Sequence, residues 1–343
     1  PNIALLPALQ AAGYEIAYVG SYEGIEKKLI ADFNIPYTGI STGKFRRYLD
    51  PKNFSDPFRV MKGFVEARNY LKNYQPDVVF SKGGFVGVPV VRAAASLHIP
   101  CIIHESDMTP GLANKLCIPV AEKVCCNFPE TMKNIPADKA VLTGSPIRAE
   151  LAQGSRLAGL NMCGFTANKP VIMVIGGSLG AANVNKAVRD ALPKLLEDFQ
   201  VVHLCGKDKI DNLLLNTPGY KQFEYIKAEL KDIFAMADVV ISRAGANAIC
   251  ELLALKKPNI LIPLPAASSR GDQLLNAASF EAQGYSIVLN EDDITTNLLV
   301  DKVHELYFNR QNYVEAMSRS HQMDAINTIM LLINEAANKS HTQ

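Results

Sequence analysis

The sequence lacks the bulk features that mark several classes of protein. Its 343 residues carry a formal net charge of only +1, which argues against a protein that binds nucleic acid or acidic polymers through overall charge. It contains no apolar run of about 18 residues and no signal-peptide pattern. If the protein works at a membrane, we therefore expect it to lie on the surface.

The cysteines do not indicate a disulfide or metal-bound scaffold either. The seven cysteines are odd in number and irregularly spaced, Cys125 and Cys126 are adjacent, and no C-x-x-C pair occurs. This spacing indicates neither a zinc site nor a disulfide framework. We therefore expect a reducing, cytosolic environment and no bound metal.

The sequence does contain the pattern of an α/β protein with two domains. The length suits two domains, and an apolar fraction of 48% is normal for a chain that buries a core. Short β-rich runs alternate with helical runs such as Phe58–Tyr74 and Gly87–Leu97, which indicates parallel sheets covered on both faces. The expected strands are Tyr14–Gly20, Asp77–Ser81, Ile99–His104, Lys123–Asn127, Val171–Ile175, Val201–Leu204, Asp238–Ser242, Asn259–Pro263 and Ser286–Leu289.

An internal similarity favours two related halves. Segments 77–84 and 238–245 are identical at five of eight positions, and each reads as a buried strand followed by Ser, a cation and a glycine turn. Chance is the alternative, because D-V-V before a strand is common. The alternating pattern independently favours two Rossmann-like halves.

We expect an N-terminal domain over residues 1–147, a C-terminal domain over 148–320, and a helix within 321–343 that returns to the first domain. The helical pattern near the end of the chain runs from Tyr313 to Ala337. At the start, Pro1 to Ala12 reads as a helix that is followed directly by a strand. Because a Rossmann-like half should open with a strand and a turn, we expect the protein to have both before Pro1.

The strongest motif is a strand, a glycine turn and a helix over residues 171–188. Gly176, Gly177 and Gly180 let the backbone approach an anion closely, and the free N–H groups at the helix start favour phosphate. The motif is not G-x-G-x-x-G, and no acidic residue ends the next strand, which disfavours a dinucleotide site. A plain tight turn is the alternative.

Two further polar turns follow strands in the second half. The run Ser242–Glu251 opens a helix with small residues, and Glu251 is placed to accept both hydroxyls of a ribose. An ordinary solvated helix acid is the alternative. In the loop 268–276, the amides of Gln273 and Asn276 suit sugar hydroxyls because they donate and accept, and a polar loop with a helix cap is the alternative.

In the first half, His104, Glu105 and Asp107 follow the expected strand. Ligands of open α/β sheets gather at the carboxyl ends of strands. These side chains are therefore candidates for a general base, which is typically worth about 10²–10⁴ in rate. The alternative is a His that caps the strand and acids that cap the helix near Gly111–Asn114.

The segment Lys44–Lys72 combines eight cations with three acids and six interleaved aromatic residues. Such a composition suits the anionic face of a bilayer, where each cation contributes on the order of 1 kcal/mol. Some of the aromatic residues must instead belong to the core. Single-stranded RNA would also suit this composition, but the rest of the chain offers no RNA module, so we expect no nucleic-acid partner.

Taken together and in this order, the motifs resemble the MurG family of bacterial transferases, in its Gram-positive-like form, over essentially the whole chain. The most specific segments are Phe80–Phe85, His104–Lys115, Gly144–Arg148, Gly176–Ser178 and Ser242–Glu251. The resemblance implies an α/β GT-B glycosyltransferase fold, with two Rossmann-like domains that face a cleft. It implies inverting transfer of GlcNAc from UDP-GlcNAc to the C4 hydroxyl of undecaprenyl-diphosphate-linked MurNAc-pentapeptide, which converts lipid I to lipid II in peptidoglycan synthesis.

The resemblance also implies roles for particular residues. Gly177 and Ser178 would contact the diphosphate, and Arg148 would line the nucleotide side. Ile226 would meet uracil through its backbone, and Gln273 would read the hydroxyls of GlcNAc. Diphosphate and ribose would lie along Ala246, Asn247, Ala248, Ile249, Cys250 and Glu251, with the ribose on Glu251.

The resemblance places the protein on the cytoplasmic side of the cell membrane as a peripheral enzyme. The first domain would bind the acceptor and the anionic membrane surface, and the second would bind UDP-GlcNAc. Other proteins of cell-wall synthesis are possible partners, no metal is obligatory, and no cofactor is implied.

Two departures from the family pattern affect the acceptor side. The family has a first glycine loop, ending in a His, just before the position of Pro1, and some members carry Asn where Asp107 stands. The alternatives are a UDP-GlcNAc 2-epimerase of the same architecture and a non-catalytic scaffold of cell-wall synthesis. The basic and aromatic segment counts against the epimerase, which needs no lipid acceptor.

Overall fold

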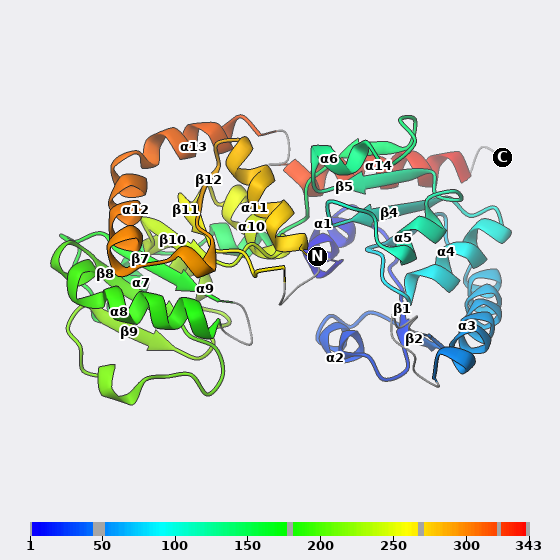
Figure 1. The fold of residues 1–343 in the computed structure, drawn as a ribbon. Coiled ribbons are helices and arrows are strands. Elements are labelled where there is room, and N and C mark those ends of the chain that lie inside the picture. The colour runs from blue at the N-terminus through cyan, green and yellow to red at the C-terminus, as the bar shows by residue number, and fades with distance from the viewer. Residues whose placement is uncertain (1, 44–51, 177–180, 267–270, 321–323, 341–343) are drawn as a thin grey trace. The chain divides into compact units, whose positions relative to one another are not determined.

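The computed structural model describes residues 2–43, 52–176, 181–266, 271–320 and 324–340. The chain divides into two compact units (Figure 1), each of which is described by itself. One unit comprises Pro1–Pro146 together with Asp324–Gln343, and the other comprises Ile147–Met323.

The second unit is built on a six-stranded parallel sheet with the order β12-β11-β10-β7-β8-β9. Its strands are β7 (Val171–Ile175), β8 (Gln200–Leu204), β9 (Tyr220–Phe223), β10 (Val239–Ser242), β11 (Asn259–Leu261) and β12 (Ser286–Val288). From one edge, the strands come third, second, first, fourth, fifth and sixth in chain order, which is the doubly wound arrangement. The strand order reverses between β7 and β10.

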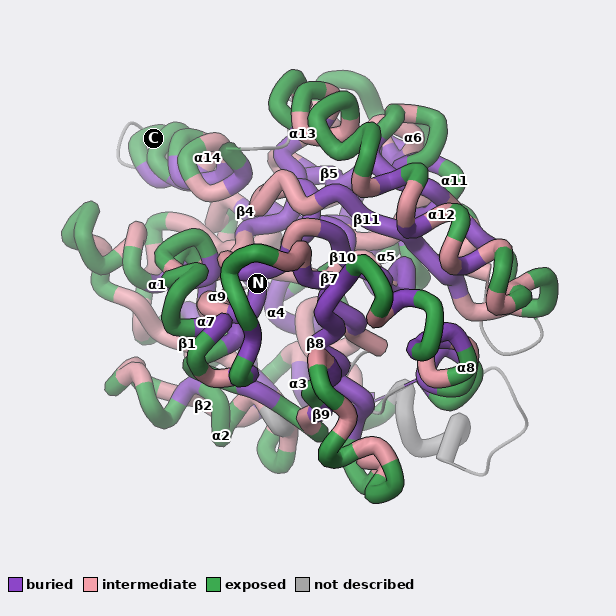
Figure 2. Tube along the Cα trace, turned by 90° about the vertical axis from the view of Figure 1, so that its left-hand side faces the viewer, coloured by how far each residue is buried: buried purple, intermediate pink, exposed green. Residues whose placement is uncertain are grey.

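Helices and short turns of 3-10 helix surround this sheet. They are η1 (Ala149–Ala152), α7 (Arg156–Cys163), α8 (Ala182–Asp198), η2 (Asn212–Leu214), α9 (Leu230–Met236), α10 (Ala246–Ala254), α11 (Asp272–Ala282), η3 (Glu291–Asp293), α12 (Thr296–Phe308) and α13 (Arg310–Ser318). Buried apolar side chains of α8 and α12 form one core with β7, β8, β10, β11 and β12. Figure 2 shows the strands β7 and β10 buried and the outer side of α8 exposed. Helices thus bury strands such as β7 and β10, which explains why the sequences of these strands are continuous apolar runs.

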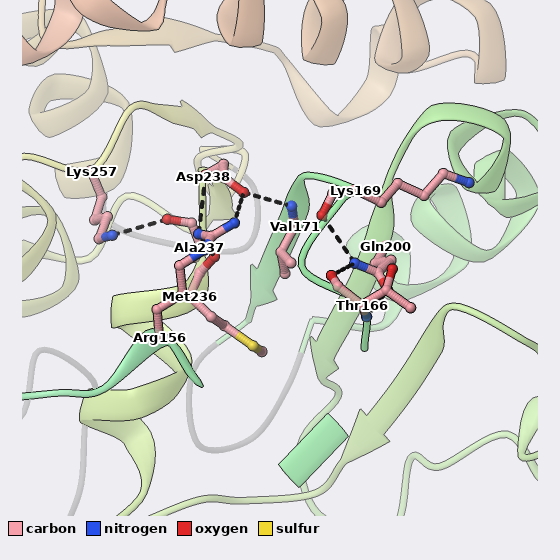
Figure 3. Close-up of polar contacts among 9 residues, drawn as sticks. All are labelled: Arg156, Thr166, Lys169, Val171, Gln200, Met236, Ala237, Asp238 and Lys257. Atoms are coloured by element: carbon pink, nitrogen blue, oxygen red, sulfur yellow. Dashed lines mark hydrogen bonds and ion pairs between the residues drawn. The ribbon is translucent and has the colours of Figure 1, made fainter. Parts of the chain in front are cut away.

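The amino ends of β7 and β10 are held by Asp238, which begins the repeated D-V-V segment (Figure 3). Its Oδ2 accepts a hydrogen bond of 2.8 Å from Val171 N, and its carboxylate takes two hydrogen bonds of 3.1 and 3.2 Å from Arg156. Lys257 Nζ donates to Ala237 O at 2.9 Å beside it. These contacts hold the amino ends of β7 and β10 in place.

The first unit contains a four-stranded parallel sheet, β3-β4-β5-β6, and a two-stranded parallel sheet, β1-β2. Their strands are β1 (Tyr18–Ser21), β2 (Tyr37–Ile40), β3 (Val79–Ser81), β4 (Cys101–Glu105), β5 (Lys123–Cys126) and β6 (Ala140–Leu142). Its helices are α1 (Asn2–Ala11), α2 (Ile25–Ala31), α3 (Lys52–Tyr74), α4 (Gly87–Ser96), α5 (Leu112–Cys117), α6 (Pro129–Met132) and α14 (Ala325–Ser340).

Both faces of the four-stranded sheet are covered. Side chains of α3, α4 and α5 pack with β4 and β5 in one cluster. In a second cluster, Leu5 of α1 packs with Ile329 and Ile333 of α14 against Ile102 and Cys125. The last helix of the chain thus belongs to the first unit. Successive residues of β4 therefore enter the two clusters in turn, as expected for a strand with two buried faces.

The structure corrects the expected elements in several places. The expected helical run Tyr313–Ala337 is not continuous, because α13 ends at Ser318 in the second unit and α14 begins at Ala325 in the first. Asp324, just before α14, accepts a 2.8 Å hydrogen bond from the side chain of Asn327 in the first turn of that helix. The strand expected over Tyr14–Gly20 begins only at Tyr18, and β2, β6 and β9 were not predicted.

Candidate functional site

A candidate anion site in the second unit lies where the strand order reverses. The paired strands β7 and β10 are parallel and end at Ile175 and Ser242, which are register partners, so α8 and α10 both begin at this edge. The residues before these helices are Ala181 and Gly245, and neither makes a side-chain capping hydrogen bond. The first-turn N–H groups of both helices can therefore donate to an acceptor from outside the helix, and their dipoles favour an anion.

Glu251 lies on α10, and the positive charge of Arg148 acts on its carboxyl group. Burial raises the pKa of the Glu251 carboxyl group, and the positive charge of Arg148 opposes that rise. Glu251 is thus partly removed from solvent. Arg148 also pairs with Glu150 at 3.2 Å, but both of those side chains are largely exposed, so that pair contributes little.

Other predicted donor-site residues follow strands that end at the same edge of the sheet. Gln273 lies in the first turn of α11, and its Oε1 accepts a 3.1 Å hydrogen bond from Leu264 N. This contact fixes the amide so that its NH₂ group is left to donate. Asn276 is buried and donates to Ala244 O at 3.0 Å, so it holds the turn before α10.

The remaining donor-site predictions fall into three groups. Ile226 is buried in the segment after β9, so only its backbone could meet a base. Ile249 and Cys250 are also buried, whereas Ala246, Asn247 and Ala248 are at least partly accessible at the start of α10. Gly177 and Ser178 lie outside the described residues.

In the first unit, His104 is completely buried at the end of β4. Its Nδ1 lies 2.8 Å from Lys82 Nζ, and its Nε2 lies 2.9 Å from Gly144 O. Because an ammonium group can only donate, Nδ1 accepts and Nε2 carries the proton. Burial, and after it the charge of Lys82, holds the pKa of His104 well below its usual value. His104 is therefore a neutral imidazole that orients Lys82.

Glu105 and Asp107 differ in their surroundings. Glu105 is 3% exposed and accepts hydrogen bonds from Asp107 N at 2.9 Å, Gly111 N at 3.1 Å and Asn114 Nδ2 at 2.9 Å. It thus holds the loop and the start of α5, as the alternative interpretation expected. Asp107 is only partly buried, and its carbonyl oxygen accepts from Thr131 Oγ1 at 3.2 Å.

Sequence reasoning did not assign a role to Lys82. Its ammonium group reaches both His104 and, at 3.4 Å, Ser145 Oγ. The repeated segment carried a signal, because Lys82 and Arg243 are its two equivalent cations. The partners of Lys82 lie 22 and 63 residues away, so sequence spacing could not identify them.

The helix α3 presents an apolar surface. Phe58, Met61 and Val65 are 79%, 64% and 50% exposed, and their spacing places them on one side of the helix. Phe64 and Tyr70 of the same helix pack against the core instead, as expected for some of the aromatic residues. Residues 44–51, which contain part of the basic cluster, lie outside the described residues. Among the helices formed by described residues, none combines the length and apolar character needed to cross a membrane.

Two Rossmann-like units, the second with a doubly wound sheet, define the GT-B class of glycosyltransferases, which is an α/β fold. Two domain families match the chain: the glycosyltransferase family 28 N-terminal domain over residues 1–126 and the family 28 C-terminal domain over residues 171–330. The chain belongs to glycosyltransferase family 28.

The chain is also similar to curated relatives over nearly its full length. A protein of Lachnospira eligens, named UDP-N-acetylglucosamine–N-acetylmuramyl-(pentapeptide) pyrophosphoryl-undecaprenol N-acetylglucosamine transferase, is 62% identical over 98% of this chain and 95% of its own length. A relative of the same name from Lachnoclostridium phytofermentans is 63% identical over 98% and 94%.

Solved structures agree with the fold. The crystal structure of Acinetobacter baumannii MurG matches with a TM-score of 0.76 and 28% identity over 98% of this chain and 95% of that one. A UDP-GlcNAc 2-epimerase from Neisseria meningitidis, bound to UDP-GlcNAc, matches with a TM-score of 0.67 over 97% and 95%, at 13% identity. The second likeness concerns the fold alone.

Proposed function

We propose that this enzyme transfers GlcNAc from UDP-GlcNAc to the C4 hydroxyl of the lipid-linked MurNAc-pentapeptide, with inversion at the anomeric carbon. The product of this step in peptidoglycan synthesis is lipid II. The observation that carries the proposal is the 62% identity, over 98% of the chain, to a relative with that named activity. The uncapped starts of α8 and α10 on adjacent parallel strands support it, because they suit the diphosphate of the donor.

The donor half of the reaction belongs to the second unit. The diphosphate lies against the first turns of α8 and α10, where Gly177, Ser178 and Ala246 are its expected neighbours. Glu251 accepts hydrogen bonds from the ribose, and the NH₂ group of Gln273 meets a hydroxyl of GlcNAc. As the C1–O bond breaks, negative charge grows on the departing UDP, and the helix N-termini stabilise it electrostatically.

The acceptor half requires a group that accepts a proton. The C4 hydroxyl oxygen attacks C1 of GlcNAc, and its proton passes to a carboxylate. Of the three candidates, Asp107 suits this role because it is the one residue of the three that is not buried. His104 and Glu105 are buried and occupied by contacts within the protein, so they position Lys82 and the loop.

A direct assay tests the activity. Incubation of the enzyme with UDP-GlcNAc and lipid I is expected to release UDP and form lipid II in equal amounts. Release of UDP without a disaccharide would contradict the acceptor assignment. Formation of the 2-epimer of UDP-GlcNAc without acceptor would support the epimerase, and UDP-GlcNAc binding without any turnover would support a scaffold.

The protein's location is part of the proposal. We place the enzyme on the cytoplasmic face of the membrane, attached through α3, because Phe58, Met61 and Val65 expose a continuous apolar surface beside the cations Arg59 and Lys62. Amphipathic contacts of this kind combine apolar burial with attraction to anionic lipid.

Vesicle binding tests this location. Substitution of Phe58 and Met61 by Ser is expected to reduce binding to anionic vesicles while the affinity for UDP-GlcNAc is unchanged. The matched control is Leu213→Ser, which removes an apolar side chain that is 93% exposed in the second unit. If the wild type, the Phe58 and Met61 double variant and Leu213→Ser all bound vesicles equally, α3 would not be the membrane-binding helix.

A further inference from the structure

A buried ion pair, together with a hydrogen bond to its carboxylate, links three separate segments of the second unit. Arg243, in the turn after β10, pairs through its guanidinium with the carboxylate of Glu291 in η3, and the two side chains are only 10% and 7% exposed. The other carboxylate oxygen of Glu291 accepts a 2.6 Å hydrogen bond from Asn183 Nδ2, in the first turn of α8. One carboxylate therefore contacts both the turn before α10 and the start of α8.

The turn that contains Arg243 is fixed from several directions. Arg243 Nη1 donates to Ile262 O at 3.0 Å and to Pro263 O at 3.3 Å, at the end of β11. Asn276 Nδ2 of α11 donates to the carbonyl oxygen of the next residue, Ala244, at 3.0 Å. Arg243 is thus directed into the protein, and Glu291 supplies the opposite charge that a buried guanidinium requires.

These contacts converge on the two helix starts that the proposed function assigns to the donor diphosphate. An anion that spans both starts needs their N–H groups held at a fixed separation and orientation. At the start of α10, the described residues Ala246 and Ala248 have no polar side chain that could serve this purpose. Glu291, about 40 residues beyond α10 in the sequence, joins the two segments through side chains alone.

We infer that Glu291 is a positioning residue for the donor site: it holds Arg243 and Asn183 so that the starts of α8 and α10 bind a nucleoside diphosphate together. The inference rests on the proposed function for the identity of the ligand. It predicts that loss of Glu291 weakens binding of UDP and UDP-GlcNAc and leaves acceptor recognition unaffected. A merely structural role would lower the melting temperature without this selective effect on the donor.

The test compares Glu291→Ala and Glu291→Gln with Asp292→Asn, which removes a charge from the adjacent exposed position in η3. We expect Glu291→Ala to raise the Kd for UDP and the KM for UDP-GlcNAc by about tenfold or more, because the two helix starts lose their common support. Glu291→Gln keeps an oxygen for Asn183 and is expected to show a smaller rise. Asp292→Asn and the KM for the acceptor are expected to stay at the wild-type values.

A second variant protects the test against misfolding. Asn183 is exposed, so Asn183→Ala breaks one arm of the contact without leaving a buried charge, and it too is expected to raise the Kd for UDP. Unchanged UDP affinity in both Glu291→Gln and Asn183→Ala would overturn the inference. Binding of UDP is measured by calorimetry without acceptor or turnover. A wild-type protein that binds UDP but forms no lipid II would therefore contradict the proposed function alone.

Discussion

Replacement of Asp107 by Asn tests the assignment of the proton acceptor. The substitution removes the basic oxygen but preserves size and shape. Two contacts that place the residue involve its backbone: its N–H donates to Glu105 Oε1 at 2.9 Å, and its carbonyl accepts from Thr131 Oγ1 at 3.2 Å. Both survive in the variant, so the loop is expected to keep its conformation.

The expected magnitude follows from the role of a general base. Loss of the proton acceptor should lower kcat by about 10²–10⁴, while KM for UDP-GlcNAc changes by less than about threefold. The plot of kcat against pH should also lose the acidic limb that reports protonation of the base. A matched control is Asp138→Asn, which removes an exposed carboxylate elsewhere in the first unit.

Steady-state kinetics with UDP-GlcNAc and lipid I, followed by UDP release, provide the assay. His104→Gln serves as a comparison, because a neutral buried His should act through Lys82 and should not account for the acidic limb. If Asp107→Asn kept kcat within about threefold of the wild type, the assignment would be wrong. Disappearance of the acidic limb in His104→Gln instead would identify His104 as the base.

Three other predictions concern the second unit. Asp238→Ala should lower the free energy of unfolding, measured with urea, by about 2–4 kcal/mol. The reason is that the buried N–H of Val171 loses its charged acceptor and that the partly exposed ion pair with Arg156 is lost. A change below about 0.5 kcal/mol would contradict this. Burial lowers the pKa of His203 to about 3, so below pH 6.5 the unfolded chain binds a proton that the folded chain does not. Stability should therefore fall by about 1.4 kcal/mol per pH unit as pH drops from about 6.5 toward 4, and His203→Gln should flatten that dependence; equal slopes would contradict the assignment. Glu251→Ala should raise the KM for UDP-GlcNAc by about 10- to 100-fold, because hydrogen bonds to the ribose are lost. The KM for the acceptor should stay unchanged. An equal rise in both KM values would indicate general damage to the enzyme.

The strands with continuous apolar sequence could be predicted because burial on both faces leaves a local signal. The run Val171–Ile175 forms the expected strand, and the repeated D-V-V segments run directly into β3 and β10. The strand β9 (Tyr220–Phe223) has no continuous apolar sequence, because it lies at a sheet edge, alternates buried and more exposed residues, and carries Lys221 and Gln222. The break before α14 falls near the polar run 318–322, where the apolar spacing is interrupted and the chain passes from one unit to the other.

The candidate site was less predictable, because side-chain roles depend on partners far away in the sequence. The position of His104 at a strand end suggested a base, but its contacts with Lys82 and Gly144 make it a buried orienting group. Similarly, Arg243 looked like part of a glycine turn, and only the fold brings it to Glu291, 48 residues later. Sequence patterns pointed to the carboxyl edges of the sheets, where we expect ligands, and tertiary contacts separated buried supporting residues from accessible ones.

The most direct test of the account is the product formed from UDP-GlcNAc and lipid I by the purified enzyme. We predict one disaccharide-linked lipid for each UDP released, with GlcNAc joined through a β bond to the C4 oxygen of MurNAc. A product with any other linkage, UDP release without lipid II, or conversion of UDP-GlcNAc to its 2-epimer would contradict it.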